Sequence, residues 1–399
     1  MVRILPQTFQ DDCLWVCLDP HSAQNGLLRF ENLAGSKLLS FNPLKSCFVF
    51  LGKKKARKEL EEAFRQNPPL LYGKPLKIET QGTYLGEELG MDVSNSTSLT
   101  INKRIGLATK AIFEIKSVVE DTRSRVVGGI LSGVLLWKCS VLPFLLSHAS
   151  CWMEIKRRDM EKLIKLQNLF LNVILGVRNC PTPLMLWDLK LLSIPLQILK
   201  AKLLLFHHIS TLNEKALAKQ VLNEQQRLGL PSVFDEIKPF LSKYEVADIK
   251  SFSKKAWSGF VNTKIEYENC QQILEASKSY KKLDFLSLSC EEYEVKPYFY
   301  NLNLAQSRIK FRERSLTMNH CKMHFPSQNQ FLKTAFVCPS CSEVNSNDSQ
   351  QPIFYDQLSH WRVCSKYAKM RISKNLEDDF DLTNYYSQII KLRASELEV

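Results

Sequence analysis

Two adjacent carboxylates stand near the start of the sequence, at Asp11 and Asp12, directly before the apolar run 13–18. Carboxylates beside a buried strand are costly unless they turn outward or bind cations. Two divalent ions held by carboxylates can clamp the attacking and leaving oxygens of a phosphoryl transfer. Two interpretations are therefore open for this pair: a magnesium site, or an exposed turn of the kind that aspartate favours.

Four potential zinc ligands lie toward the other end of the sequence. Cys338 and Cys341 form a C-x2-C pair, and His360 and Cys364 form an H-x3-C pair, with eighteen residues between Cys341 and His360. Two thiolates at this spacing can chelate one ion, and the second pair completes the tetrahedron that structural zinc requires. The spacing predicts one Zn²⁺ site, and the alternative is four unrelated side chains.

A basic segment with neighbouring aromatic rings precedes these cysteines. Arg308 and Arg312 are four residues apart, so they share one face of the helix expected here, and three aromatic residues stand at 298–300. Guanidinium groups beside rings that stack on bases suit RNA or single-stranded DNA. The chain has 54 Lys and Arg against 41 Asp and Glu, a net charge of +13, which also fits a polyanionic partner. The alternative for the basic segment is a solvated helix.

The elements that must position these groups follow from the apolar pattern. Residues 1–92 indicate mixed α/β structure, and the region from 95 to 317 has helical periodicity. The expected strands are 13–18, 47–51 and two short ones within 70–85. The first expected helix runs from residue 22 to Asn42-Pro43 and has one apolar face, formed by Leu27, Leu28, Phe30, Leu33, Leu38 and Leu39. The other expected helices are 53–66, 99–119, 125–152 with a kink at Pro143, 157–177 and 194–212.

Most of the twelve cysteines stand singly in apolar runs. Cys13, Cys17, Cys139 and Cys151 are therefore predicted to be small core residues rather than disulfide partners. The pair at 207–208 is predicted to be two histidines on a helix surface.

The longest apolar stretch, 126–136, is short for a membrane span, and no signal peptide opens the sequence. We expect an intracellular protein, in the nucleus or cytoplasm, without a membrane partner.

Several short motifs occur in an order that resembles one protein family. Phe9-Gln10-Asp11-Asp12 is followed by a helix, by Asn42 and Lys45-Ser46, by the strand 47–51 and by Tyr84-Leu85-Gly86. The same series of elements is found from motif C to motif E of the reverse transcriptases of non-LTR retrotransposons. The helical region also resembles invertebrate members of this family, in the segments 102–106, 127–129, 136–137 and 203–208.

The resemblance implies roles for individual residues. Asp11 and Asp12 would ligate catalytic Mg²⁺, and Lys45 would be a general acid for the leaving pyrophosphate. Tyr84 and Gly86 match the hairpin that grips the primer end. Lys103 and Arg104 would face the template–primer duplex, and with Arg308 and Arg312 they complete the expected nucleic-acid-binding set. Cys338, Cys341, His360 and Cys364 resemble the family's C-terminal CCHC zinc site, with a longer spacer than usual.

The resulting expectation is an α+β protein. It comprises a partial reverse-transcriptase palm (1–92), a mainly helical thumb and connection region (93–318), a zinc-knuckle-like segment (319–370) and a tail with a short helix (371–399). Only ten residues precede Asp11. The resemblance therefore implies that motifs A and B are missing and that this chain binds RNA and DNA without polymerising alone. The alternative is a helical zinc-binding scaffold or interaction protein without polymerase ancestry.

Overall fold

The fold is mostly helical, with four small sheets among the residues that the computed structural model describes. These residues are 7–9, 12–14, 16–17, 19–52, 54–90, 93–121, 128–178, 180–280, 288–315, 381–386 and 388, and for 7–9, 12–14, 93–94 and 313 only the backbone is described. The predicted α+β class is confirmed at this level. The chain forms two compact units. Unit 1 comprises Met1–Leu107, His148–Leu163 and Leu212–Ala247, and unit 2 comprises Ala108–Ser147, Ile164–Thr211 and Asp248–Val399.

Unit 1 contains all the described strands, each in a two-stranded sheet. The pairs are β1 (Gln7–Phe9) with β2 (Asp12–Leu14), β3 (Cys47–Val49) with β6 (Lys77–Glu79), β4 (Leu70–Leu71) with β5 (Lys74–Pro75), and β7 (Gly82–Tyr84) with β8 (Glu87–Leu89). Only the β3–β6 pair is parallel among them. The helices of this unit include α1 (Pro20–Ser36), α2 (Lys54–Gln66), α9 (Leu217–Arg227) and α10 (Val233–Lys243).

The core around β3 is aromatic. Phe64 of α2 meets the ring of Phe48 at 4.9 Å and the ring of Phe50 at 5.0 Å, both edge to face. Ala23 of α1 completes this buried cluster, and Ile78 of β6 packs against it. The strand predicted at 47–51 and the helix predicted at 53–66 are confirmed by these elements. Edge-to-face rings add about 0.5–1.5 kcal/mol beyond the apolar area that they bury.

Helix α1 differs from its prediction. It begins at a capping box in which Asp19 accepts a hydrogen bond from the Ser22 N–H at 2.8 Å, and it ends at Ser36 rather than at Asn42. Its buried face carries Phe30 with small residues, whereas Leu33 is exposed. The predicted apolar face is therefore confirmed at Phe30 and wrong at Leu28 and Leu33, which are exposed. Small residues complete the buried face in place of leucines.

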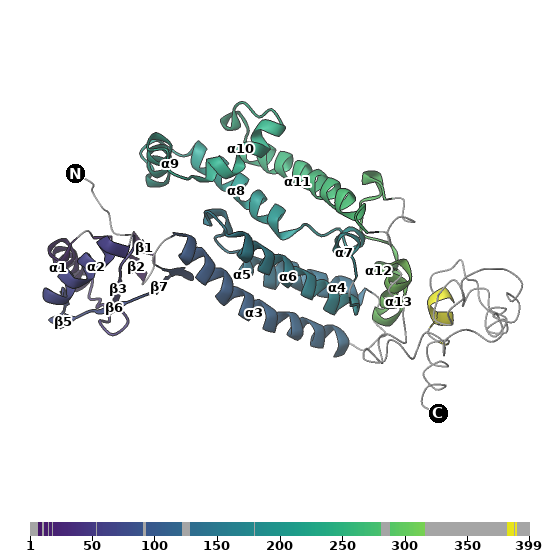
Figure 1. The fold of residues 1–399 in the computed structure, drawn as a ribbon, viewed down its shortest axis with the longest axis horizontal. Helices are drawn as coiled ribbons and strands as arrows, with labels where there is room; N and C mark the ends of the chain where they lie inside the picture. Colours follow the sequence, from purple (N-terminus) through teal and green to yellow (C-terminus); the bar gives the residue numbers. More distant parts are fainter. Residues whose placement is uncertain are drawn as a thin grey trace, which may run out of the picture. The chain divides into compact units, whose positions relative to one another are not determined.

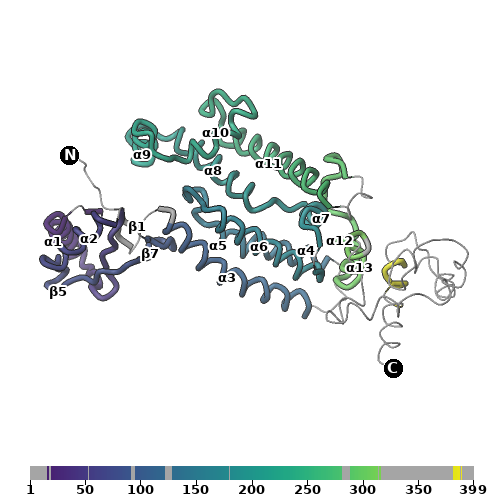
Figure 2. Tube along the Cα trace, in the orientation of Figure 1, coloured from purple at the N-terminus to yellow at the C-terminus, as the bar shows by residue number. Residues whose placement is uncertain are grey.

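Unit 2 is built from helices (Figures 1 and 2). Helices α3 (Val93–Asp121) and α6 (Arg157–Leu175) each contribute residues to both units. The other elements of unit 2 are α4 (Gly129–Leu136), η1 (Trp137–Val141), α5 (Leu142–Leu145), α7 (Thr182–Asp188), α8 (Ile194–Thr211), η3 (Ile249–Ser251), α11 (Lys254–Ser277), η5 (Cys290–Glu292), α12 (Tyr298–Asn301) and α13 (Leu304–Arg314). The predicted helices at 99–119, 157–177 and 194–212 are thus confirmed. Helices α8 and α11 run side by side.

The predicted kink near Pro143 is a π-helical segment. Residues Trp137–Val141 form η1, and the N–H of Leu142 donates to the carbonyl of Trp137, five residues earlier. Proline lacks an N–H, and its ring clashes with the carbonyl four residues before it, so a wider turn relieves both problems. The Trp137 ring stacks on Phe170 of α6 with 4.5 Å between centroids. The helix therefore continues through the proline and keeps its tryptophan buried.

Two buried amides hold the loop between α7 and α8. The Asn269 side chain donates to the Leu191 carbonyl and accepts from the Ser193 N–H, both at 3.0 Å. The Gln167 side chain donates to the Leu192 carbonyl at 2.8 Å and accepts from the Ile194 N–H at 3.1 Å. Four backbone groups of one buried loop thus find partners on α6 and α11, which offsets the cost of removing them from water.

The structure corrects three predictions about single side chains. Cys139 and Cys151 are exposed rather than in a core. Cys270 and Cys290 form a disulfide between α11 and η5, a pairing that the sequence did not suggest. His207 is buried, stacks on Trp257 and has its Nε2 at 2.9 Å from the Phe252 carbonyl oxygen, so it is not a surface residue.

In the described part of the chain, every helix is too short or too polar to cross a bilayer.

Candidate nucleic-acid interface

The β7–β8 hairpin carries two of the predicted binding residues. Tyr84 pairs with Glu87, so Leu85 and Gly86 form a two-residue loop. Both loop residues have positive φ, 49° and 78°, as a type I′ turn requires. This turn matches the twist of the strands, and glycine adopts its second position without strain. A Cβ added to Gly86 would meet nothing within 4 Å, so the backbone at this turn is open to an approaching ligand.

Helix α3 brings the next predicted residue, Arg104, against this turn. Its guanidinium donates to the Gly86 carbonyl at 3.3 Å and to Glu87 Oε1 at 2.6 Å. The side chain is only 5% exposed and lies over the Trp152 ring, 5.6 Å from its centre. Charge-assisted hydrogen bonds and the cation–π contact add to each other here. Arg104 therefore fixes the turn from within the protein.

Glu87 is the common acceptor of this cluster. Besides Arg104, Trp152 Nε1 donates to this carboxylate at 3.3 Å, and His148 Nδ1 lies 3.1 Å from it. His148 has a φ of 55°, a left-handed conformation that is uncommon outside glycine and that the surrounding contacts must hold. Three side chains from two distant segments thus converge on one carboxylate at the hairpin turn.

Lys103 presents a more accessible positive charge beside the same hairpin. Its Nζ donates to Glu88, and its side chain is 55% exposed. Glu88 also accepts hydrogen bonds from Thr83 Oγ1 at 3.1 Å, and its N–H donates to Thr100 Oγ1 at 2.8 Å. The Glu88 carboxylate is only 10% exposed, so this pair is not a fully solvated one. The Lys103 ammonium has three donors and a half-exposed side chain, so it can bind a phosphate besides Glu88.

Tyr84, Gly86, Lys103 and Arg104 were identified from separate stretches of sequence, and the structure brings them together. Their roles differ: Gly86 and Arg104 shape the turn, whereas Lys103 faces solvent. Four residues of the site, Glu87, Glu88, His148 and Trp152, were not predicted. Glu87 could have been suspected from its position next to the turn. His148 and Trp152 could not, because nothing in the sequence around residues 148–152 reveals contact with the hairpin sixty residues earlier.

The predicted catalytic residues are described only in part. Asp12 belongs to β2, with its backbone opposite Phe9 of β1, while Asp11 and the Asp12 side chain lie outside what is described. Lys45 is exposed, in a turn before β3 where its N–H donates to the Asn42 carbonyl at 3.1 Å. An Asx turn, with Asn42 Oδ1 accepting from the Leu44 N–H at 2.9 Å, shapes this segment.

Arg308 and Arg312, on α13, lie in unit 2 and bind backbone carbonyls. Arg308 donates to the carbonyls of Ile174 and Val173 and pairs with Glu120 at 3.0 Å. Arg312 donates through two nitrogens to the Gly176 carbonyl, with Nε at 3.1 Å. Both side chains are half-buried. Their shared helix face, predicted from the spacing, is directed at the end of α6.

The predicted zinc ligands, Cys338, Cys341, His360 and Cys364, all fall outside the described residues. Within the described ranges there is no group of three or more His, Cys, Asp or Glu side chains that could hold a metal ion. Comparison of the chain with family models, with curated proteins and with solved structures found no match.

Proposed function

We propose that this chain is part of a reverse transcriptase of a non-LTR retrotransposon and that it binds RNA and DNA through the β7–β8 turn and the exposed side of α3 next to it. One observation carries the proposal: Tyr84, Gly86, Lys103 and Arg104, selected by their resemblance to family motifs, meet in one site. We assign binding, and not polymerisation, to this chain.

The chemistry of the site suits a nucleic-acid strand. The open turn at Gly86 lets a sugar–phosphate backbone approach, and Lys103 supplies a positive charge. Tyr84, half-buried at the end of β7, supplies an aromatic ring against which a base could stack. Arg104 contributes by holding the turn, since its donors are directed at Glu87 and the Gly86 carbonyl. The net charge of +13 adds long-range attraction to a polyanion.

The second candidate function is a helical scaffold or interaction protein. One observation favours it: Arg104, Arg308 and Arg312 donate hydrogen bonds to carbonyls and carboxylates of the protein itself. A scaffold would bind nucleic acid weakly and without dependence on the hairpin. The two functions are therefore separated by whether Lys103 and Tyr84 affect binding.

A salt titration of RNA binding, followed by fluorescence anisotropy, tests the proposal. Each lost phosphate contact reduces the slope of log affinity against log salt by about 0.7–0.9. We expect Lys103→Gln to reduce the slope by about this amount and Tyr84→Ala to weaken binding with little change of slope. Lys278→Gln is the matched control, because Lys278 is also an exposed lysine paired with one glutamate, Glu275. Equal slopes for Lys103→Gln and Lys278→Gln would favour the scaffold.

A further inference from the structure

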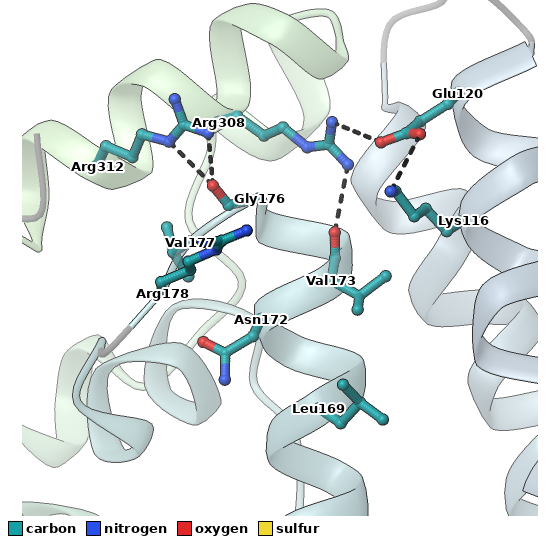
Figure 3. A pocket seen from close by; sticks show the side chains of 10 residues that line it. All are labelled: Lys116, Glu120, Leu169, Asn172, Val173, Gly176, Val177, Arg178, Arg308 and Arg312. Atoms are coloured by element: carbon teal, nitrogen blue, oxygen red, sulfur yellow. Dashed lines mark hydrogen bonds and ion pairs between the residues drawn. The ribbon is translucent and has the colours of Figure 1, made fainter. Parts of the chain in front are cut away.

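Unit 2 contains a cavity of about 480 Å³ with an unusual number of basic side chains in its wall (Figure 3). Arg178, Arg308, Arg312 and Lys116 line it, with Glu120 as the single carboxylate among its lining residues. These groups come from α3, from α13 and from the chain that follows α6. We call this cavity the arginine cavity.

The arginine cavity is built on the C-terminal end of α6. The last carbonyls of a helix have no partner within the helix. Here Gly176 ends α6 with a φ of 62°, and the Val177 N–H donates to the Asn172 carbonyl at 3.0 Å, as in a Schellman motif. The carbonyls at this helix end accept hydrogen bonds from Arg308 and Arg312 (Figure 3).

Glycine suits the position of Gly176, because its φ of 62° strains any other L-residue. A Cβ at this position would lie 3.0 Å from Cδ and Nε of Arg308 and 3.2 Å from a terminal nitrogen of Arg312. Both arginine side chains would therefore have to shift to make room for a larger residue. The chain therefore holds two guanidinium groups side by side at one helix end, although like charges repel each other.

The positive charge of the cavity is only partly compensated within the described residues. Glu120 pairs with Arg308 at 3.0 Å and with Lys116 at 3.8 Å, so one carboxylate serves two cations. Arg312 is bound to a carbonyl alone, and burial together with the neighbouring Arg308 lowers its pKa. Arg178 is exposed, and no described side chain pairs with it. The helix C-terminus offsets about half a unit charge, which leaves a net positive cavity.

We propose that the arginine cavity binds a phosphate group, with Arg178 and the outer N–H groups of Arg312 as its donors. Guanidinium groups match phosphate oxygens in geometry and form short charge-assisted hydrogen bonds with them. A bound dianion also neutralises the repulsion between Arg308 and Arg312. The phosphate can belong to a free nucleotide or to a nucleic-acid strand. This site is independent of the hairpin in unit 1.

The test titrates the full chain by isothermal calorimetry with two probes, inorganic pyrophosphate and a short single-stranded RNA. Arg178→Gln removes one donor and leaves the Gly176 carbonyl capped. Arg157→Gln is the matched control, because it removes the same charge. Arg157 is 94% exposed and lies at the start of α6, whereas Arg178 follows the end of this helix. We expect the dissociation constant to rise about tenfold in Arg178→Gln and by less than about twofold in Arg157→Gln.

A second variant keeps the net charge constant. Gly176→Ala displaces both guanidinium groups and should weaken phosphate binding while circular dichroism shows that the helices remain. Dependence of pyrophosphate binding on Arg178 supports a free phosphate ligand, and dependence of RNA binding alone supports a strand. If Arg178→Gln and Arg157→Gln bind both probes equally well, the proposed site is refuted. RNA binding that needs Lys103 but not Arg178 would refute this site and leave the hairpin interface standing.

Discussion

Arg104 and Glu87 form an ion pair with 2.6 Å between nitrogen and oxygen, in which the guanidinium is almost completely buried and the carboxylate is one-quarter exposed. The pair joins α3 to the first residue of β8, directly after the hairpin turn. Because a buried charge is costly to leave unpaired, the turn and the helix are expected to keep one arrangement.

The first prediction concerns this pair. Arg104→Ala should lower the free energy of unfolding by about 3 kcal/mol, since it leaves a partly buried carboxylate with weaker donors. Lys103→Ala removes a half-exposed lysine from Glu88, which keeps the hydrogen bond from Thr83, and should cost less, about 1–2 kcal/mol. Urea unfolding followed by circular dichroism measures both. Equal losses of unfolding free energy in the two variants would show that burial does not increase the contribution of Arg104 to stability.

The second prediction concerns pH. Burial raises the pKa of Tyr293 to about 12 from a usual value of 10.0. An acid whose pKa is raised by folding stabilises the folded state fully below its unfolded pKa, and this contribution is lost as the pH rises through the folded pKa. Stability should therefore fall between pH 10 and 12. The urea midpoint of Tyr293→Phe should decrease less over this range than that of the wild type or of Tyr267→Phe, whose ring is half exposed.

The third prediction concerns the disulfide between Cys270 and Cys290, which are 20 residues apart. A cross-link that closes a loop of this size stabilises a protein by about 3 kcal/mol, largely by restricting the unfolded chain. A reductant should lower the unfolding midpoint of the wild type but not of Cys290→Ser. Cys139→Ser, which changes an exposed free thiol, should respond to reductant as the wild type does. A wild type that is insensitive to reductant would show that this bond does not stabilise the fold.

The fourth prediction concerns zinc. The C-x2-C and H-x3-C pairs predict about one zinc ion per purified chain, because four such ligands close a tetrahedral site. Cys338→Ser and His360→Ala should each lower the metal content measured by elemental analysis. Cys151→Ser is the control for the loss of an unrelated thiol. Protein that stays empty after refolding with excess zinc would eliminate the site.

Local patterns predicted the helices well, because their information lies within a few turns. The helix predicted at 157–177 from its apolar periodicity is one example: it is found as α6, and Leu163 and Phe170 lie on its buried face. In α1 the same reasoning was right for Phe30 and wrong for Leu28 and Leu33, since the rest of the buried face consists of small residues that carry little apolar signal. The class of fold was thus accessible from the sequence, and the packing of individual faces was not.

The candidate site shows a similar division. The turn at Gly86 and the positive charges at Lys103 and Arg104 were visible in the sequence. Their partners were not, because Glu87 is reached from α3 and from His148, and such long-range contacts depend on the complete fold. Arg308 and Arg312 were correctly placed on one helix face, but only the structure shows that this face caps the end of α6.

The π-helical segment Trp137–Val141 has a consequence for the rotational phase of the helix that it interrupts. Its turn holds one residue more than an α-turn, and each residue rotates a helix by about 100°. The wider turn takes up this extra residue, so deleting the exposed residue Lys138 should restore a regular turn and leave Leu142 and Leu145 buried. If the unchanged sequence formed a regular α-helix instead, both leucines would turn away from the core by about 100°. The wide turn therefore sets which face of the following helix is apolar.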